Sequence, residues 1–493
     1  MKDESKFSKV LSILLSVVLV ISSFYLLYQV IRLNVLPSKF LFPLTIGVVV
    51  LDAIFILLLI YFSKNVVSKI VCILLTLFIC VATCMGGYYI SKTQNVLSNI
   101  TNVAKHAKNT VSVIVKESSS IKNKSQLNDV SVGSLRLNEQ GSKKVLKELS
   151  GEGIVLNQTE YDSMTALLEA FYNGEVDSII INESSRSQIL DMEAYSNFDS
   201  NTRVVYQTSY KVKNNDSATS VSDITSKPFN VLISGSDTRG GFDENGRSDV
   251  IMIATVNPKT HTILLTSVPR DFYVTTACDA GDGCMQGALD KITHTGIHGT
   301  NTTKRTVEQL LGIEINYTFK VGFDTVTELV DVLGGVDVYV EPGYATTTSE
   351  FSVHEGVNHL NAQQALAFAR ERYSYTEGDR QRTKNQQQVL MGIVKEATKP
   401  SVITNYAAIM DTMANTFSTT MSNEEITDLI KYQLNNNPTW KMEQYMVDGT
   451  DDTLMCAELG DAASVMVPDQ STVKMAKDKI NAVLAGKSSE DVK

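Results

Sequence analysis

The stretch FNVLISGSDTRGGFDENGRSDVIMIATVNPKTHTILLTSVPRD, residues 229–271, predicts the core of an α/β domain. It contains three apolar runs that are separated by turn signals such as Asn257-Pro258, and each run has the length of a buried strand. Charged side chains lie next to the ends of these runs. They are Asp237, Arg239, Arg247, Asp249 and Arg270.

Carboxylates beside arginines at strand ends predict a hard cation next to a phosphate-like anion. Asp237 and Asp249 suit Mg²⁺, with Mn²⁺ as an alternative, because Mg²⁺ prefers one or two carboxylates together with substrate oxygens. The guanidinium group of arginine matches the geometry of phosphate oxygens. Further candidates occur later in the chain, and most are cationic. They are Lys291, Arg370, Arg372, Asp379, Arg382 and Gln386.

Two predicted helices carry most of these later candidates. Arg370 and Arg372 lie at the end of a helix expected at 360–371, and Asp379 is the expected N-cap of a helix at 380–396. Arg382 and Gln386 are four residues apart, so they share one face of that helix. Ordinary surface polarity is the alternative explanation for this pair. A cluster of so many cations indicates an anionic ligand such as pyrophosphate.

Three apolar runs near the N-terminus, at 10–31, 40–62 and 71–90, predict membrane-spanning helices. A span needs about 20 apolar residues, and a cleaved signal peptide is not expected because two further runs follow the first. The flanking lysines and arginines do not decide the orientation. We expect the short N-terminal tail in the cytoplasm and the rest outside the cell. Asp52, within the second run, is either functional or structural, and in the second case it pairs with a neighbouring helix or lies at a locally wet site.

The chain of 493 residues is too long for one ordinary domain. Strand and helix signals alternate after the spans, with a helical stalk at 91–111, strands at 130–135, 153–156, 176–182 and 203–210, and helices between them. Helices are also expected at 406–417, 423–435 and 471–484, with an irregular acidic segment at 443–459. The expected parts are a transmembrane region (1–92), an accessory α/β domain (93–213), a linker (214–228), a catalytic domain (229–398), a helical extension (399–485) and a disordered tail (486–493).

Composition and cysteines narrow the choice of function. A net charge of −10 excludes the general electrostatic footprint of a nucleic-acid-binding protein. Cys278 and Cys284 bracket a short loop, and in an oxidising exterior they either form a disulfide or stay free thiols. His294 and His298 have the spacing of metal ligands on a helix, but the glycines around them and the lack of a third ligand argue against zinc.

Several motifs within about residues 229–395 resemble the LytR–CpsA–Psr family. They are, in order, GSDTR, GRSDV, SVPRD, DKITH, LLGGVDVYV, ALAFARER and GDRQRTKNQQ. The three spans and the extra domain are similar to the streptococcal CpsA-type capsule proteins. The resemblance implies an extracytoplasmic α/β–α catalytic domain. It implies a Mg²⁺-dependent phosphotransferase that moves capsular polysaccharide or a related glycopolymer from a polyprenyl-pyrophosphate carrier to the 6-hydroxyl of N-acetylmuramic acid in peptidoglycan.

The resemblance also implies roles for the candidate residues. Asp237 and Asp249 hold the metal, and Asp379 lies near the attacking hydroxyl. Arg270, Arg370 and Arg372 act on the pyrophosphate in catalysis. The substrate-binding residues are Arg239, Arg247, Lys291, Arg382 and Gln386. Asn385 stands where many relatives have an arginine, which removes one anion contact, and whether Lys384 replaces that contact is open at this level.

Two other functions remain open at this level. One is a membrane regulator of capsule expression or chain length, and the other is a polyprenyl-pyrophosphate hydrolase or binder. The same site serves transfer and hydrolysis, and only the exclusion of water separates the two. The expected partners are the lipid-linked glycopolymer, peptidoglycan, the membrane and capsule biosynthesis proteins, and nucleic acid is not expected among them.

Overall fold

The computed structural model describes residues 6–62, 65–103, 106–213, 216–236, 244–279, 283–399, 408–409, 412 and 417–493. The chain folds as two compact units. The first comprises Met1–Asn99, Thr398–Ala414 and Asn423–Pro438, and the second comprises Ile100–Ala397, Asn415–Ser422 and Thr439–Lys493. Asp237 and Arg239 lie outside the described residues, as does most of the helix predicted at 406–417.

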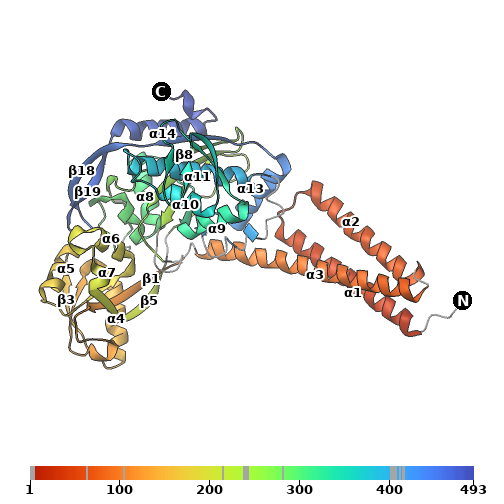
Figure 1. The fold of residues 1–493 in the computed structure, drawn as a ribbon, viewed down its shortest axis with the longest axis horizontal. Helices are drawn as coiled ribbons and strands as arrows, with labels where there is room; N and C mark the ends of the chain where they lie inside the picture. Colours follow the sequence, from red (N-terminus) through yellow and green to blue (C-terminus); the bar gives the residue numbers. More distant parts are fainter. Residues whose placement is uncertain are drawn as a thin grey trace. The chain divides into compact units, whose positions relative to one another are not determined.

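The first unit contains three long apolar helices, which are labelled in Figure 1. They are α1 (Lys6–Leu33), α2 (Ser38–Leu57) with a π-helical turn (Leu58–Phe62), and α3 (Val66–Val103). Segments of 26, 25 and 29 residues within them are long and apolar enough to cross a membrane. Many of their large apolar side chains are exposed, which suits contact with lipid. The three predicted spans are therefore confirmed as helices of spanning length.

Two polar side chains within these helices donate hydrogen bonds to groups on other segments of the same unit. The Ser23 hydroxyl donates to Asp52 Oδ1 at 2.9 Å, and Lys69 Nζ donates to the carbonyl of Leu59 in the π-helical turn at 2.7 Å. A carboxylate in apolar surroundings is costly unless a neighbour donates to it. Of the alternatives for Asp52, the structure shows pairing with a neighbouring helix.

The predicted helix at 423–435 is confirmed as α13 (Asn423–Asn436).

The second unit begins with the accessory domain, residues 106–213, which is built on a five-stranded sheet of order β3-β2-β4-β1-β5. The strands are β1 (His106–Lys116), β2 (Ser131–Leu135), β3 (Asn157–Tyr161), β4 (Ser178–Asn182) and β5 (Thr202–Lys213). The helices are α4 (Glu139–Gly151), α5 (Met164–Asn173), α6 (Arg186–Asp191) and α7 (Phe198–Asn201). Ile114, Phe171 and Ile179 are fully buried in its core. The predicted α/β alternation is confirmed.

Two sequence predictions for the accessory domain are wrong. The predicted stalk ends too late, because β1 starts at His106 and pairs along its whole length with β5. The strand predicted at 153–156 is displaced to β3, which is an edge strand with mostly exposed side chains. Polar, exposed side chains on an edge strand remove the apolar alternation on which a strand prediction depends.

The rest of the second unit, from residue 216 onward, is the main domain, and it is built on a six-stranded sheet of order β16-β11-β6-β7-β8-β17. The strands are β6 (Phe229–Ser236), β7 (Val250–Asn257), β8 (Thr262–Ser267), β11 (Tyr317–Gly322), β16 (Phe417–Thr419) and β17 (Lys441–Met446). β6, β7 and β8 are antiparallel neighbours, whereas β11 runs parallel to β6 and β17 runs parallel to β8. The three strands predicted from the opening stretch are confirmed as the centre of this sheet.

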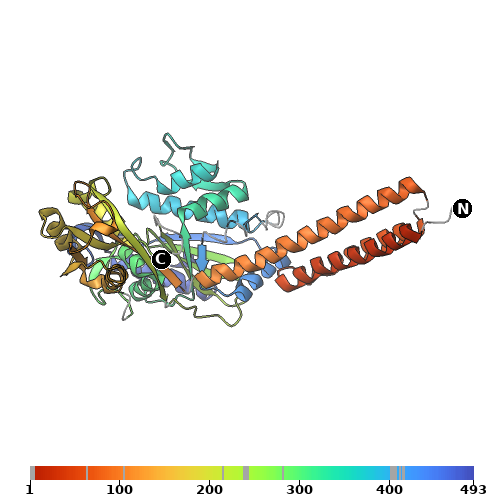
Figure 2. The ribbon, with the colours of Figure 1, turned by 90° about the horizontal axis from the view of Figure 1, so that it is seen from below.

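Helices cover both faces of the main sheet. The helices are α8 (Thr300–Leu311), α9 (Phe323–Leu333), α10 (Ala362–Arg370), α11 (Asp379–Ala397) and α14 (Gln470–Leu484). α8 and α14 pack over Leu232, Ile253 and Leu264. α9, α10 and α11 form a separate layer with its own core around Phe368 and Val389, and Figure 2 shows this layer on the opposite side of the strands. The α/β class is confirmed.

The helical extension predicted at 399–485 is wrong. β16 and β17 are the two edge strands of the main sheet, so Asn415–Ser422 and the chain from Thr439 onward belong to the main domain. In place of an irregular segment at 443–459, the chain forms β17 and the hairpin β18 (Gly449–Cys456) and β19 (Asp461–Pro468). Asp451 and Asp452 are exposed, and aspartate is rare in strands. The sequence of β18 therefore does not show a typical strand pattern.

The disordered tail predicted at 486–493 is also wrong. The Ser488 hydroxyl and the Ser489 backbone N–H each donate to the Glu443 carboxylate at 2.8 Å. Burial alone would raise the pKa of Glu443, but hydrogen bonds from Lys441, Ser489 and Ser488 outweigh it and lower the pKa to about 2. A buried carboxylate needs such partners, and the tail supplies two of them.

The predicted linker is bound to the main domain by hydrogen bonds. Within the predicted linker, Asp216 Oδ2 accepts a hydrogen bond from the Thr318 hydroxyl, and the carbonyl of Ser217 accepts one from Lys304 Nζ at 2.9 Å.

Cys278 and Cys284 form a disulfide, which is the first of the two alternatives that the sequence left open.

Candidate active site

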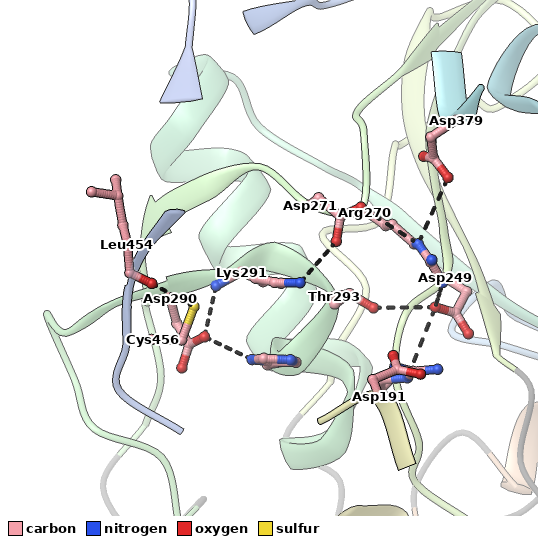
Figure 3. A network of polar contacts seen from close by, with 12 residues as sticks. Asp191, Asp249, Arg270, Asp271, Asp290, Lys291, Thr293, Asp379, Leu454 and Cys456 are labelled. Atoms are coloured by element: carbon pink, nitrogen blue, oxygen red, sulfur yellow. Dashed lines mark hydrogen bonds and ion pairs between the residues drawn. The ribbon is translucent and has the colours of Figure 1, made fainter. Parts of the chain in front are cut away.

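The ends of β6, β7 and β8 bring charged residues to one edge of the main sheet. Because neighbouring strands are antiparallel, the end of β6, the start of β7 and the end of β8 meet there. Asp249 immediately precedes β7, and Arg270 follows β8 by three residues. Arg270 Nη1 donates to Asp249 Oδ1 at 2.9 Å, as Figure 3 shows. The predicted convergence of charges at strand ends is confirmed for this pair.

A chain of buried hydroxyl groups holds the loop that carries Asp249. The Ser248 side chain is 1% exposed and shares hydrogen bonds with the hydroxyls of Ser234 and Thr303, at 2.9 and 3.0 Å. A Cβ atom on Gly296 would overlap the Ser248 hydroxyl and the Gly246 carbonyl. Only glycine at position 296 therefore allows the loop to approach this closely.

Arg270 is the centre of a network of three carboxylates. Its Nε lies 3.8 Å from Asp271 Oδ2 and 4.0 Å from Asp379 Oδ1, in addition to the hydrogen bond with Asp249. Burial alone would lower the pKa of the Arg270 guanidinium, but the three carboxylates outweigh burial and raise it. Arg270 therefore stays charged, and its position is fixed from three sides.

Lys291 and Thr293 extend the network on the side of Asp249 and Asp271. Lys291 Nζ donates to Asp271 Oδ1 at 3.3 Å, and the Thr293 hydroxyl lies 3.4 Å from Asp249 Oδ1 (Figure 3). Both residues lie at the start of the 3₁₀ segment that contains Gly296. One local element thus positions the loop, the lysine and the threonine together.

Asp379 and Arg382 approach the network from α11. Asp379 is the first residue of the helix, and its carboxylate forms an ion pair with Arg382 one turn later. The predicted N-cap role is wrong, because the side chain points to Arg382 and Arg270 instead. Burial is the main cause that lowers the pKa of Arg382, and the positive charge of Arg270 adds to it. Two arginines this close favour an anion between them.

Arg247 connects the network to the accessory domain. Its Nε lies 4.0 Å from Asp249 Oδ1, and its Nη1 forms an ion pair with Asp191 at the end of α6. We call the residues of the main domain that meet here the anion cluster. Its members are Arg247, Asp249, Arg270, Asp271, Lys291, Asp379 and Arg382.

Several polar atoms of the anion cluster are buried without a hydrogen-bond partner among the described residues. They are the Nε atoms of Arg247, Arg270 and Arg382. Leaving a buried donor unpaired costs about 1–3 kcal/mol, and more when the group is charged. Three guanidinium donors in one network could therefore donate to the oxygens of an anionic ligand.

The structure places the other candidates at the edge of the cluster. Arg372 is close enough to lower the pKa of Arg382, while its own guanidinium stacks on Tyr373. Arg370 ends α10 with an exposed side chain, and Gln386 lies one turn beyond Arg382 on α11. The contacts that define the anion cluster do not include Arg370 or Gln386, so the roles expected for these two remain predictions.

Lys384 does not take the place of the arginine that many relatives have at position 385. Its Nζ lies 3.7 Å from Glu341 Oε2 and above the ring of Tyr344. Asn385 is 2% exposed and donates to the carbonyl of Phe368 at 3.1 Å. Asn385 therefore fixes α11 to α10 and has no free polar group for a ligand.

The two histidines have carboxylate partners. His294 Nδ1 lies 2.7 Å from Asp290 Oδ1, and His298 Nε2 lies 3.1 Å from Glu458 Oε2. The described residues contain no group of three or more His, Cys, Asp or Glu side chains that could hold a metal. Cys456 lies beside Asp290, and burial raises the pKa of its thiol to about 12, so it is not a reactive nucleophile.

Sequence reasoning missed three residues of the site. Asp271 follows Arg270 directly, and Thr293 lies two residues after Lys291, so proximity in sequence was an available signal for both. Asp191 belongs to another domain, and its sequence surroundings carry no comparable signal.

Comparison with known proteins gives consistent matches. A model of the LytR_cpsA_psr family matches residues 194–482, more than half of the chain. The polyisoprenyl-teichoic acid–peptidoglycan teichoic acid transferase TagU of Bacillus cereus (strain AH820) is 31% identical over 241 residues, which are 48% of this chain and 76% of the relative. TagU of Bacillus subtilis (strain 168) is 34% identical over 203 residues, 41% of this chain and 63% of the relative. The crystal structure of B. subtilis TagU is 28% identical, covers 52% of this chain and 97% of that chain, and has a TM-score of 0.40.

Proposed function

The chain belongs to the LytR_cpsA_psr family, and on this premise we propose that it attaches a glycopolymer to peptidoglycan outside the cell. It is an enzyme, and its reaction is a phosphotransfer. The proposed donor is a glycopolymer on a polyprenyl-pyrophosphate carrier, and the proposed acceptor is the 6-hydroxyl of N-acetylmuramic acid. Relatives are named for teichoic acid, whereas the resemblance to CpsA-type proteins favours capsular polysaccharide or a related polymer.

The observation that carries this proposal is the set of unpaired donors in the anion cluster. The Nε atoms of Arg247, Arg270 and Arg382 are buried, and no described residue accepts a hydrogen bond from them. A pyrophosphate group offers several anionic oxygens, and guanidinium groups bind such oxygens in short, charge-assisted hydrogen bonds. The proposal places the donor's pyrophosphate among these three arginines.

The reaction balances as one direct displacement. The acceptor oxygen forms a bond to the phosphorus that carries the glycopolymer, the bridging P–O bond breaks, and polyprenyl phosphate leaves with the bonding electron pair. Arg270 and Arg382 stabilise the charge that develops on the phosphate oxygens. The carboxylate of Asp379 lies beside Arg270 and Arg382, and we assign it to receive the proton of the acceptor hydroxyl.

Mg²⁺ is the proposed metal, with Mn²⁺ as an alternative. The Asp249 carboxylate and the neighbouring Thr293 hydroxyl are hard oxygen donors of the kind that Mg²⁺ prefers, and Asp237 is the proposed second carboxylate. When bound, the ion would supply positive charge against the repulsion between the pyrophosphate and the attacking oxygen. A site with few protein carboxylates suits Mg²⁺, because substrate oxygens complete its coordination.

The proposed location follows from the three apolar helices. The three spans among the described residues put the segments before and after them on opposite faces of the membrane. With the N-terminal side proposed to be cytoplasmic, both soluble domains would lie outside. The membrane and the lipid-linked donor are proposed partners at this surface, together with capsule biosynthesis proteins.

The test compares two arginine variants in cells that lack the native copy of this protein. Arg270→Ala should lower the amount of glycopolymer bound to peptidoglycan at least about 100-fold, which is the usual cost of removing one charge-stabilising donor. The control is Arg305→Ala. Arg305 lies on α8, and its ion pair with Asp279 is more exposed than the pair of Arg270 with Asp249. Both variants should be present in the membrane fraction at normal levels. Normal attachment by Arg270→Ala would contradict the proposal.

A further inference from the structure

A polar cavity lies where the accessory domain faces the main domain. Its volume is about 340 Å³, within the range of about 300–1,000 Å³ that is typical of small-molecule sites. The accessory domain contributes residues of β1, β4, β5 and the segment before α4. The main domain contributes Asn245, the disulfide loop at Cys284, and the end of the 3₁₀ segment at His298. Both domains belong to the same compact unit.

Three asparagines of the accessory domain line this cavity with unpaired amide atoms. Asn109 Oδ1, Asn182 Oδ1 and Asn138 Nδ2 are buried, and none of them has a hydrogen-bond partner among the described residues. The whole side chain of Asn138 is more than nine-tenths buried. A buried polar group without a hydrogen-bond partner destabilises the folded chain. The cavity wall therefore carries three amide side chains whose hydrogen-bonding capacity is not filled by the described residues, and a turn of each amide would present it to a molecule in the cavity.

Charged side chains in and beside the cavity wall have polar partners. Arg136 lies 3.3 Å from Asp162, and His298 lies 3.1 Å from Glu458. A strongly ionic ligand is therefore not required, in contrast to the anion cluster. The wall also contains Tyr210 and the apolar side chains of Leu135 and Val212, which can pack against C–H groups.

The cavity and the anion cluster share one loop. Asn245 lines the cavity, and Arg247, two residues later, belongs to the anion cluster. The loop is also tied to the accessory domain, because Lys108 Nζ forms an ion pair with Glu244 at 3.1 Å. On the opposite wall, Gly283 has a positive φ, and a Cβ there would lie 3.3 Å from the carbonyl of Leu137. A molecule in the cavity is thus held close to the loop that carries Arg247.

We propose that this cavity binds an uncharged saccharide unit with hydroxyl and acetamido groups, as a glycan subsite beside the anion cluster. Sugar hydroxyls donate to Asn109 and Asn182, Asn138 donates to a hydroxyl or an acetamido carbonyl, and Tyr210 packs against the C–H face of the ring. The choice of a saccharide among neutral polar molecules rests on the proposed function, because the substrates of that reaction are glycans.

The test measures binding by calorimetry with the full chain in lipid nanodiscs. The probes are di-N-acetylchitobiose, maltose, a neutral alanine tripeptide and inorganic pyrophosphate. Wild-type protein should bind the chitobiose, and Asn182→Ala and Asn138→Ala should each weaken that binding at least about 10-fold, which corresponds to about 1.4 kcal/mol. Asn157→Ala is the control, since Asn157 is an exposed asparagine on β3 of the same domain.

The outcomes separate this inference from the proposed function. Pyrophosphate should bind to wild-type protein and to the asparagine variants equally, whereas Arg270→Ala should lose it. The control for correct folding is the melting temperature of each variant. It should not fall markedly in Asn138→Ala, because the lost amide donor had no hydrogen-bond partner among the described residues. The inference is overturned if no saccharide binds, if only the peptide binds, or if chitobiose binds equally well to the asparagine variants.

Discussion

Arg247 of the main domain forms an ion pair with Asp191 of the accessory domain, while its Nε lies 4.0 Å from Asp249. One guanidinium thus joins a helix end of one domain to the carboxylate that pairs with Arg270 in the other. The accessory domain therefore contacts the anion cluster directly through the Asp191 carboxylate.

Asp191→Asn should impair catalysis without much loss of stability. The Asp191 side chain is 61% exposed, and exposed ion pairs contribute only about 0–1 kcal/mol to folding. Without this partner, Arg247 loses a fixed orientation, so we expect kcat/KM for transfer to fall about 3- to 10-fold. Glu152→Gln is the matched control, because it breaks an exposed pair with Lys124 on the same domain. Equal kinetics for Asp191→Asn and the control would contradict the role given to this contact.

Gly296→Ala should displace the loop that carries Arg247 and Asp249. The added methyl group would overlap the Ser248 hydroxyl and the Gly246 carbonyl, so the loop must move. We expect a loss of about 1–3 kcal/mol in the free energy of unfolding and at least a 10-fold loss of transfer activity. Gly151→Ala, where nothing lies within 4 Å of the new Cβ atom, is the control for urea unfolding and activity. Full activity in Gly296→Ala would show that the close approach is unimportant.

Glu443→Gln should destabilise the protein at neutral pH but not at low pH. The pKa of Glu443 is lowered to about 2 in the folded chain, so its stabilisation is complete above the unfolded value of about 4.5 and disappears as the pH falls towards 2. The loss at pH 7 is at most about 3 kcal/mol. The melting temperatures of the variant and the wild type should differ most above pH 5 and converge in acid.

Glu490→Gln is the control for this pH series. Glu490 also pairs with Lys441, at 2.7 Å, but its side chain is 70% exposed. Its replacement should change the melting temperature little at any pH. A difference for Glu443→Gln that stays constant from pH 7 to pH 3 would show that the tail does not hold an ionised carboxylate.

The centre of the fold could be predicted from sequence because its signals are local. β6, β7 and β8 are continuous apolar runs with turns between them, and antiparallel pairing of neighbouring strands then brings Asp249 and Arg270 to one edge. The same holds for the positions of α10 and α11, whose helical spacing signals are short-range, although the predicted cap of α11 is wrong.

The remaining features depend on contacts between distant parts of the chain. β17 joins the main sheet beside β8, which is about 180 residues earlier in the chain. The sequence of β17 contains no local signal that predicts this pairing. Asp191 meets Arg247 only because two domains pack together. The unpaired amides of Asn109, Asn138 and Asn182 come together from separate segments, so the cavity has no local sequence signal.

The most direct test of the central claim is the mass of the products formed by the purified protein in nanodiscs. The reaction contains a short lipid-pyrophosphate oligosaccharide, Mg²⁺ and peptidoglycan fragments, with Arg270→Ala run in parallel. We predict a peptidoglycan fragment that is heavier by one phospho-oligosaccharide, an equal amount of polyprenyl phosphate, and neither product with Arg270→Ala. Free oligosaccharide phosphate beside unmodified peptidoglycan would show hydrolysis instead of transfer and would contradict the account.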